Sequence, residues 1–437
     1  MPLLVLQNIW WALVLIGIMI LIHELGHYWA ARFFDVKVDT FSFGFGPRLF
    51  GFKKGETDFR VAGIPFGGYV KMAGEQPGDE NANDPRGFLS KPRWQRLIIA
   101  FAGPAMNIVL AVAILTGLFM VRYPKLPSTP SPIVGYVVAD SAAAKAGVQA
   151  GDQVVQIADV ANPTWEDIEM KEVASAGHML PVWIVRNGER KRVNITPVLD
   201  PRTGMGFAGW AEQNQIEVAD VTPDKPAAKA GLQHGDILVS VNGEPVYSTP
   251  KVLDMIAAGK PLEIKYLRDG KPGAINVAPV MSAMDGGPER WMIGAMLGPK
   301  VEFVSLSLPQ ALVESVRQNA KSATLIYQFL RGIIERRMSP KSLEGPIGIA
   351  RLSGAAAREG PTAYFGLTAM VSLNLAIFNL LPIPILDGGV ILLLIVEMFM
   401  RRDLSMRVKE AVFKLGFVFL MAVVAFVLYN DISKLAG

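Results

Sequence analysis

The chain of 437 residues contains no cysteine and only four histidines. The missing cysteines exclude a disulfide framework and a thiolate metal site, so a metal ion would have to be held by histidines and carboxylates. The sequence also lacks a basic cluster interleaved with aromatic residues, so nothing in it indicates a nucleic-acid partner. Charged residues make up only 19% of the chain and hydrophobic ones 51%, which predicts a protein that lies partly in a membrane and partly in water.

Four apolar stretches each provide the roughly 20 residues that a helix needs to cross the hydrocarbon core of a membrane. They cover residues 9–31, 97–121, 362–400 and 411–430. The third is too long for one span and is interrupted by Pro382, Pro384 and a glycine pair, so we expect a span, a break and a second apolar segment. The first lacks a preceding basic region and a clean cleavage site, which favours a span over a cleaved signal.

Lysine and arginine are distributed unevenly over the connections between these stretches. They are frequent between residues 32 and 96 and again between 401 and 409, whereas the first eight residues contain none. The positive-inside rule therefore places both basic connections in the cytoplasm. Both chain ends and the long segment 122–361 are then expected on the outer face.

The segment between the second and third stretches repeats itself. AAAKAGVQAGDQVV, from Ala142, recurs as PAAKAGLQHGDILV, from Pro226, an offset of 84 residues. A repeat this long predicts two copies of one small α+β domain, which we place at residues 128–200 and 204–299. VNGEPV in the second copy predicts a hairpin turn at Asn242-Gly243, and the first copy has IADVAN there, so its turn must differ.

Two further segments join these domains to the apolar stretches. Residues 305–361 are expected to be linker helices, and 309–338 form an amphipathic pattern that predicts a helix lying on the membrane surface or against the domains. Residues 41–72 alternate strand-forming residues with glycines, which predicts a β-hairpin that dips into the membrane. The remaining parts, 1–121 and 362–437, are the two membrane parts.

HELGH, residues 23–27, fits the pattern H-E-x-x-H inside the first apolar stretch. On a helix, His23 and His27 share one face and can hold one Zn²⁺ ion, while Glu24 can take a proton from the zinc-bound water. Ionisable groups at membrane depth cost roughly 2.5–3.5 kcal/mol each, which favours a functional role. The alternative is a pair of structural histidines that hydrogen-bond to a neighbouring helix.

A catalytic zinc site needs a third protein ligand, and the other two histidines fall in the repeated domains. The carboxylates available at membrane depth are Asp387 and Glu397. We choose Asp387, because the prolines and glycines around it predict irregular backbone, which survives in a membrane only when it is buried in protein or lines a cavity. Glu397 lies in a regular helix and is expected to pair with Arg401. The alternative for Asp387 is a turn or helix-cap residue.

HELGH in the first span, LDGG after the third and two tandem outer domains resemble the site-2 protease family of intramembrane zinc proteases, along essentially the whole chain. The likeness is to its bacterial branch with paired PDZ domains, the regulator-of-sigma-E proteases. The resemblance implies a polytopic α-helical membrane protein of the bacterial cytoplasmic membrane, with four transmembrane helices, a membrane-associated β-hairpin and two extracytoplasmic α+β PDZ domains. It implies zinc at His23, His27 and Asp387, with Glu24 as the catalytic base.

The resemblance also implies roles beyond the metal. Asn379 would help to hold the substrate backbone, and the hairpin edge at Gly68 and Tyr69 would pair with an unwound substrate. The implied substrates are single-pass membrane proteins, such as a trimmed anti-sigma factor, and remnant signal peptides. Val390 departs from the polar residue that many relatives have after LDGG. Two rival interpretations remain, a non-enzymatic membrane scaffold and a metal transporter that uses the same three ligands.

Overall fold

The computed structural model describes most of the chain. The described residues are 2–75, 84–125, 132–200, 205–282, 289–335 and 345–436. The expected domain starts at residues 128 and 204, and the expected end of the amphipathic helix at 338, lie outside these ranges.

Contacts within the chain divide it into two compact units. The helical unit comprises Met1–Tyr123, Ser305–Tyr327 and Leu343–Gly437, and the β-rich unit comprises Pro124–Val304 and Gln328–Ser342.

The helical unit contains the expected membrane spans. Four of its helices are long and apolar enough to cross a membrane. Its elements are α1 (Pro2–Phe33), β1 (Val38–Lys54), β2 (Thr57–Met72), α2 (Arg93–Val121), the part of α7 (Leu308–Ile334) up to Tyr327, α8 (Pro346–Glu359), α9 (Pro361–Leu380), α10 (Asp387–Met400) and α11 (Met406–Ala436). The third apolar stretch is divided into α9, a break and α10, as its prolines predict.

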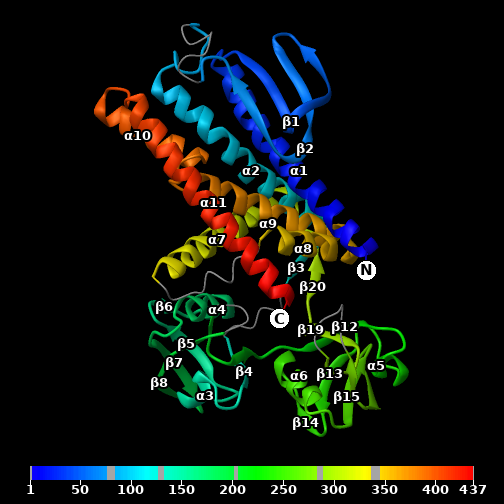
Figure 1. Ribbon diagram of the computed structural model, residues 1–437. Helices are drawn as coiled ribbons and strands as arrows, with labels where there is room; N and C mark the ends of the chain where they lie inside the picture. Colours follow the sequence, from blue (N-terminus) through cyan, green and yellow to red (C-terminus); the bar gives the residue numbers. More distant parts are fainter. Residues whose placement is uncertain are drawn as a thin grey trace. The chain divides into compact units, whose positions relative to one another are not determined.

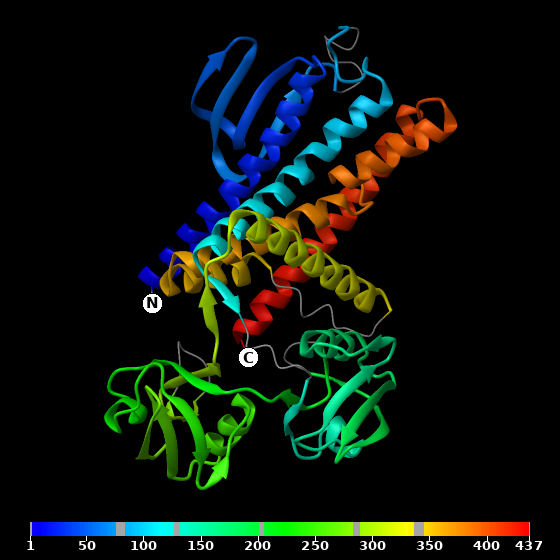
Figure 2. The ribbon, with the colours of Figure 1, turned by 180° about the vertical axis from the view of Figure 1, so that it is seen from behind.

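Helix α2 is the central element of this unit. It packs against α1, α9 and α10, as Figure 1 shows and Figure 2 confirms from behind. Small residues allow α1 and α2 to approach closely, since a Cβ atom built at Gly26 would lie only 2.3 Å from the carbonyl oxygen of Ala102. The contact places one face of α1, which carries both histidines of HELGH, directly against α2.

Helix α7 also contacts α2. The sequence predicted that this helix lies on the membrane surface or against the repeated domains, and neither position includes this contact. The hydroxyl oxygens of Thr116 in α2 and Ser315 in α7 lie 2.8 Å apart. Further along α7, Ile326 packs against the buried cluster of Ala111 and Leu373. The amphipathic pattern of α7 therefore marks a helix that covers part of the helical bundle.

The expected hairpin is present as β1 and β2, and it curls back on itself. Phe41 in β1 is paired both with Val70 near the end of β2 and with Phe59 near its start. Phe41 and Val70 are buried together with Ile99 of α2. The hairpin is thus docked on the helices through its inner residues. Among the described pairings, residues 68–72 pair only with 38–43. The backbone N–H groups of Val70 and Met72 donate instead to the carboxylates of Glu24 and Glu75.

The expected ion pair between Glu397 and Arg401 is wrong. Glu397 is completely buried, and its Oε1 accepts hydrogen bonds from Lys409 Nζ at 2.6 Å and from the backbone N–H of Leu404 at 2.9 Å. Helix α10 ends at Met400, and Arg401 takes a left-handed conformation with φ of +56°. The chain therefore turns back at Arg401 and brings the basic residue of α11 to Glu397.

Helix α8 begins without a side-chain cap of its own, at Gly345. Its free N–H groups are instead satisfied by Asp431 near the end of α11. The carboxylate accepts from the N–H groups of Gly345, Ile347 and Gly348 at 3.0, 2.9 and 3.3 Å. A carboxylate at a helix N-terminus also interacts favourably with the helix dipole, so this contact fixes α11 to α8.

The β-rich unit holds the two expected copies. The first contains β4 (Val134–Val137), α3 (Ala142–Lys145), β5 (Gln153–Ile157), β6 (Val160–Ala161), α4 (Trp165–Ala174), β7 (Leu180–Arg186), β8 (Glu189–Ile195), β9 (Val198–Leu199), β10 (Gly206–Phe207) and β11 (Trp210–Glu212). The second contains β12 (Ile216–Val221), α5 (Pro226–Lys229), β13 (Ile237–Val241), β14 (Glu244–Pro245), α6 (Thr249–Ala257), β15 (Leu262–Arg268), β16 (Lys271–Val277), β17 (Val280–Ser282), β18 (Arg290–Met292) and β19 (Ala295–Pro299). Short strands β3 (Tyr123–Lys125) and β20 (Glu302–Val304) flank them and pair with each other.

The two copies share an ion pair between a buried aspartate and a partly exposed arginine at the Gly-Asp turn of the repeat. Asp152 accepts from Arg186 at 2.6 Å in the first copy, and Asp236 accepts from Arg268 at 2.7 Å in the second. The turn of the second copy has Asn242 and Gly243 at φ of +51° and +80°. The corresponding turn residues of the first copy are Ala158 and Asp159. Of these two, Ala158 has a left-handed conformation, with φ of +47°, and Asp159 does not, so the turns differ as predicted.

The first copy extends beyond its expected end at residue 200. Ala208 and Trp210 belong to its hydrophobic core, and β11 pairs with β4. The last strand of the domain follows a turn at Gly209, which has φ of +83°, so the hydrophobic pattern alone does not reveal where the domain ends.

One core position differs in kind between the copies. Glu172 in α4 stands 84 residues before Ile256 in α6, and both are buried. The Glu172 carboxylate accepts from the backbone N–H of Ala208 at 2.5 Å and from the indole N–H of Trp210 at 2.7 Å. Burial raises the pKa of Glu172 to about 7, against a lowering by these two hydrogen bonds.

Candidate metal centre and active site

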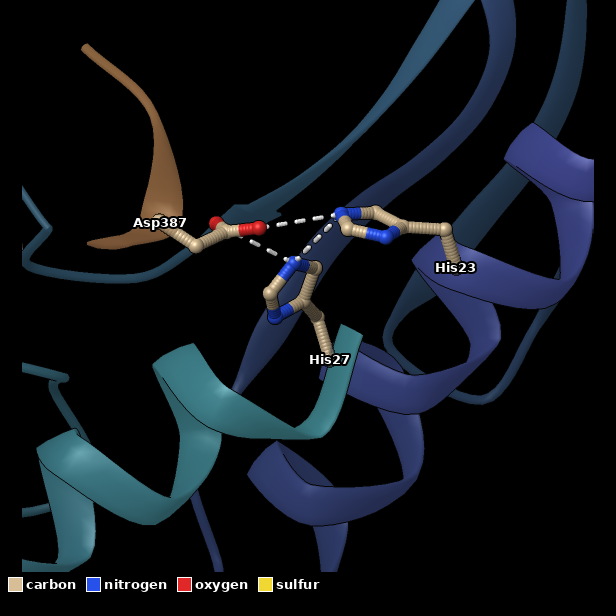
Figure 3. Close-up of side chains that lie close together, drawn as sticks. All are labelled: His23, His27 and Asp387. Atoms are coloured by element: carbon tan, nitrogen blue, oxygen red, sulfur yellow. Dashed lines mark hydrogen bonds and ion pairs between the residues drawn. The ribbon is translucent and has the colours of Figure 1, made fainter. Parts of the chain in front are cut away.

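The three predicted metal ligands come together in the helical unit. His23 and His27 are one turn apart on α1, and their Nε2 atoms lie 3.2 Å from each other. Asp387, from the start of α10, places Oδ2 at 3.1 Å from His23 Nε2 and Oδ1 at 3.4 Å from His27 Nε2. Figure 3 shows the three side chains pointing toward a common centre. Among the described residues, His23, His27 and Asp387 form the group of histidines and carboxylates that is able to hold a metal ion.

The spacing of these atoms fits zinc. With Zn–N and Zn–O bonds of about 2.0–2.2 Å, two ligands of a tetrahedral ion lie about 3.3 Å apart. The three observed separations run from 3.1 to 3.4 Å. Lone pairs of two imidazoles and a carboxylate at such distances repel one another unless a cation or a proton lies between them. Three protein ligands also leave the fourth position of a tetrahedral ion open, as a catalytic site requires.

Asp387 reaches the histidines because the chain breaks before it. Between α9 and α10 the backbone is irregular, and Ile385 has φ of +89°, which is strained for a β-branched residue. Asp387 is the first residue of α10, where the helix dipole favours a carboxylate. The acid is thus held at the start of a new helix, turned toward α1.

The glycine pair after Asp387 acts differently from what the sequence suggested. Gly388 and Gly389 lie inside the first turn of α10, and the irregular backbone precedes them. A Cβ atom at Gly388 would lie 2.2 Å from the carbonyl oxygen of Leu381, and one at Gly389 would lie 2.4 Å from that of Ile383. These glycines are required for space, because the break folds back onto the helix that follows it.

The far nitrogens of both imidazoles face α2. His27 Nδ1 lies 2.9 Å from the carbonyl oxygen of Ile99, which can only accept a hydrogen bond. Nδ1 therefore carries the proton, and Nε2 offers its lone pair to the metal position. His23 Nδ1 lies 3.3 Å from the side-chain amide of Asn107. A Cβ atom at Gly103 would lie 2.3 Å from His27 Nε2 and 2.8 Å from His23 Nε2, so α2 presses directly on the site.

Neither Asn107 nor Gly103 was identified from the sequence. The available signal was the single amide side chain in the otherwise uncharged stretch 97–121, where a buried polar group needs a partner. Nothing in the sequence marks Gly103, because glycine is frequent in membrane helices for packing reasons.

Glu24 lies beside the three ligands and under the hairpin. It is half-buried, and it interacts electrostatically with His27, His23 and Asp387. A Cβ atom at Gly68 would lie 3.1 Å from its Cγ, so the end of β2 rests on α1 at this residue. The strand segment 68–72 is therefore next to the predicted catalytic base, which accepts a hydrogen bond from the backbone N–H of Val70.

The other two predicted substrate-binding residues are Tyr69 and Asn379. The ring of Tyr69 stacks on Phe45, with centroids 6.0 Å apart, and Arg60 hydrogen-bonds to its hydroxyl. Since neighbouring residues of a strand face opposite sides, Tyr69 points away from Glu24 when Gly68 faces it. Asn379 is half-buried in the last turn of α9, just before the break. Substrate binding by these residues stays a prediction.

Comparisons with known proteins show the family to which the chain is similar. The model of peptidase family M50 matches residues 11–423. The regulator of sigma-E protease RseP of Escherichia coli is 29% identical over 457 residues, covering 97% of this chain and 98% of that protein. A protein of Treponema pallidum, whose name gives it as a predicted zinc metalloprotease, is 33% identical over 446 residues and covers 97% and 98%. A solved PDZ domain from Listeria monocytogenes is 24% identical over 19% of this chain and 87% of that domain, with a TM-score of 0.17, from which nothing further follows.

The family match spans nearly the whole chain, including both ligand-bearing segments, and the relatives are matched from end to end. Together with a ligand set that fits zinc, this identifies the protein's class. The chain belongs to peptidase family M50, the site-2 proteases, and is a zinc metalloprotease.

Proposed function

We propose that this protease hydrolyses peptide bonds within the transmembrane segments of single-pass membrane proteins. The observation that carries the proposal is the position of the ligand set. His23 and His27 lie within α1, a helix apolar enough to span a membrane, and they are buried there against α2. Ionisable groups at that depth are costly and are retained for function. A bond cut at this site is expected to lie in the substrate's membrane-embedded part.

In this proposal His23, His27 and Asp387 hold the zinc ion, and Glu24 is the catalytic base. A bound zinc ion supplies Lewis acidity, which lowers the pKa of water and polarises a carbonyl group. The Glu24 carboxylate accepts a proton from the attacking water and donates it to the leaving amine. The packing of Gly68 against Glu24 limits the directions in which this carboxylate can turn, and so keeps it beside the ligands.

The hairpin edge offers a means to unwind the substrate. A helical substrate hides its carbonyl groups in its own hydrogen bonds, and these must open before hydrolysis. Strand addition to residues 68–72 offsets the lost bonds and presents an extended backbone to Glu24. Gly68 is the edge residue nearest to the base, Tyr69 fixes the outer side of the strand, and Asn379 holds the substrate backbone from the α9 side.

The substrates we propose are anti-sigma factors already trimmed outside the membrane, and remnant signal peptides. Relatives named regulator of sigma-E protease support the first of these classes. The two repeated copies are proposed to be extracytoplasmic PDZ domains that exclude substrates with bulky outer domains. The protein is then a multi-pass protein of the bacterial cytoplasmic membrane, with both termini outside and the hairpin on the cytoplasmic side.

The test is cleavage of single-span reporter proteins, with and without an outer domain, by the purified protein in lipid vesicles. Glu24→Gln is expected to abolish cleavage and to retain zinc. Asp387→Asn is expected to lose both. Glu397→Gln is the matched control, because it makes the same acid-to-amide change at a buried carboxylate that contacts Lys409 and Leu404. It should keep zinc and activity.

The same measurements separate the rival functions. Full cleavage by Glu24→Gln contradicts the proposed mechanism. A protein that never cleaves a reporter but folds and binds partners is a scaffold. Zinc flux into vesicles through the wild-type protein, lost in Asp387→Asn, would indicate a transporter. Unchanged zinc in purified Asp387→Asn would refute the third ligand.

A further inference from the structure

Asn107 is a polar side chain that the proposed mechanism does not use. It lies in the middle of α2, and none of its surface is exposed. Its Nδ2 atom is 3.3 Å from Nδ1 of His23. Its Oδ1 atom is buried and has no hydrogen-bond partner among the described residues. The contact with His23 is therefore the only side-chain hydrogen bond that the described part of the chain offers this amide.

The state of His23 decides which end of the amide should face it. When Nε2 of His23 binds a metal ion, that nitrogen uses its lone pair, and the proton must sit on Nδ1. Nδ1 then needs an acceptor, which is the amide oxygen. A half-turn about the Cβ–Cγ bond of asparagine exchanges the side-chain oxygen and nitrogen. The shape and position of the side chain stay the same. Asn107 can thus meet His23 with its oxygen in the zinc-bound protein.

We propose that Asn107 is a positioning residue of the zinc site, whose side-chain oxygen accepts the Nδ1 proton of His23 and so aims Nε2 at the metal. This inference rests on the zinc site of the proposed function and deepens it. His27 has an equivalent partner in the carbonyl oxygen of Ile99, at 2.9 Å. Both partners belong to α2, so one helix orients both imidazoles.

Asn107 is itself tied to the segment that brings the third ligand. Its backbone carbonyl oxygen accepts a hydrogen bond from the hydroxyl of Ser372 in α9 at 2.9 Å, and Ser372 is also fully buried. Helix α9 leads through the break to Asp387. The contact therefore fixes the position of α2 along its axis relative to α9, the helix that precedes Asp387. Only at His23 is the orienting group a side chain, which makes it open to mutation.

The experiment measures the zinc affinity of the full-length protein in detergent by competition with a chelator, alongside the visible absorption spectrum of the cobalt-substituted protein. Asn107→Leu removes the acceptor but keeps the branched shape of the side chain, whereas Asn107→Asp keeps an acceptor oxygen. Asn319→Leu is the matched control, because Asn319 is buried in the same unit but hydrogen-bonds within α7, to Ser315. Melting of the metal-free variants shows whether each one folds.

We expect Asn107→Leu to lower zinc affinity by about 10–100-fold and to change the cobalt spectrum. Asn107→Asp keeps an acceptor for the Nδ1 proton of His23, and Asn319→Leu lies outside the site, so both should lose clearly less affinity than Asn107→Leu. The inference is overturned if Asn107→Leu loses no more affinity than Asn319→Leu, or if Asn107→Asp loses as much as Asn107→Leu.

The outcome also distinguishes this inference from the proposed function. A wild-type protein that binds no zinc overturns the metal site and the inference with it. Wild-type zinc binding together with an unchanged Asn107→Leu overturns the inference alone. If Asn107→Leu does not fold, Asn107→Asp decides by itself, since retained affinity supports an acceptor role and lost affinity contradicts it.

Discussion

Replacement of Gly103 by alanine tests the arrangement of α2 against the metal site. The added methyl carbon would lie 2.3 Å from Nε2 of His27 and 2.8 Å from Nε2 of His23. An ordinary contact between such atoms is about 3.4 Å, so either the His27 ring or α2 must move by about 1.1 Å. Metal sites tolerate displacements of about 0.2 Å in their ligands. We therefore expect His27 to leave the coordination shell.

The expected loss is large because a ligand itself is displaced. Changing a group that merely orients a ligand typically costs 10–100-fold in metal affinity, so about 100-fold is a lower estimate here, which corresponds to about 2.7 kcal/mol. Zinc affinity by chelator competition and reporter cleavage should fall together. The backbone of α2 need not unfold, since alanine favours a helix.

The chain offers a matched control in the same helix. Gly117 lies in α2 as well, and a Cβ atom there would meet no atom within 4 Å. Gly117→Ala should leave zinc affinity unchanged and stabilise the helix by roughly 0.5–1 kcal/mol. If Gly103→Ala binds zinc as tightly as Gly117→Ala, the contact between α2 and the histidines is not as described, and the geometry of the site must be revised.

Two further predictions concern buried charges away from the zinc site. The pKa of Glu172 is about 7 in the folded protein, against an ordinary value of 4.5. Between these pH values the folded state binds more protons than the unfolded state. The domain that contains Glu172 should therefore lose about 3 kcal/mol of stability as the pH rises from 4.5 to 7. Hydrogen exchange of strand β7 in the whole protein, corrected for the intrinsic pH dependence, should show this loss in wild type and a flat profile in Glu172→Gln; equal profiles would contradict it. Lys409→Met leaves the Glu397 carboxylate buried and unpaired, which should cost about 3–5 kcal/mol, and adding Glu397→Gln should recover much of it in thermal unfolding. A double variant no more stable than Lys409→Met would show that the pair is not coupled.

Part of the arrangement of the three predicted ligands follows from the sequence, because helical spacing is a local property. His23 and His27 had to share a face once they were on a helix, and the prolines before Asp387 had to interrupt the third apolar stretch. Their convergence within 3.1–3.4 Å could be expected only from the resemblance and from the scarcity of other ligands. The division of α9 from α10 is likewise a local consequence of sequence.

Features that depend on a distant partner were not predictable in this way. Gly103 matters because of where α1 lies, and Asn107 because of the His23 ring, and neither fact is written in residues 97–121. The pairing of Glu397 with Lys409 instead of Arg401 depends on the place where α10 ends. The doubled pairing of Phe41 depends on how far the hairpin curls, which the alternation of strand residues does not specify.

The cap that Asp431 provides for α8 makes two distant segments of the sequence depend on each other. Asp431 lies in α11, and α8 packs on α1, the helix of the zinc ligands. Without this carboxylate, three amide groups at the start of α8 lack their acceptor. Replacement of Asp431 by alanine should therefore loosen a helix some eighty residues upstream, and with it one support of the helix that carries both histidines.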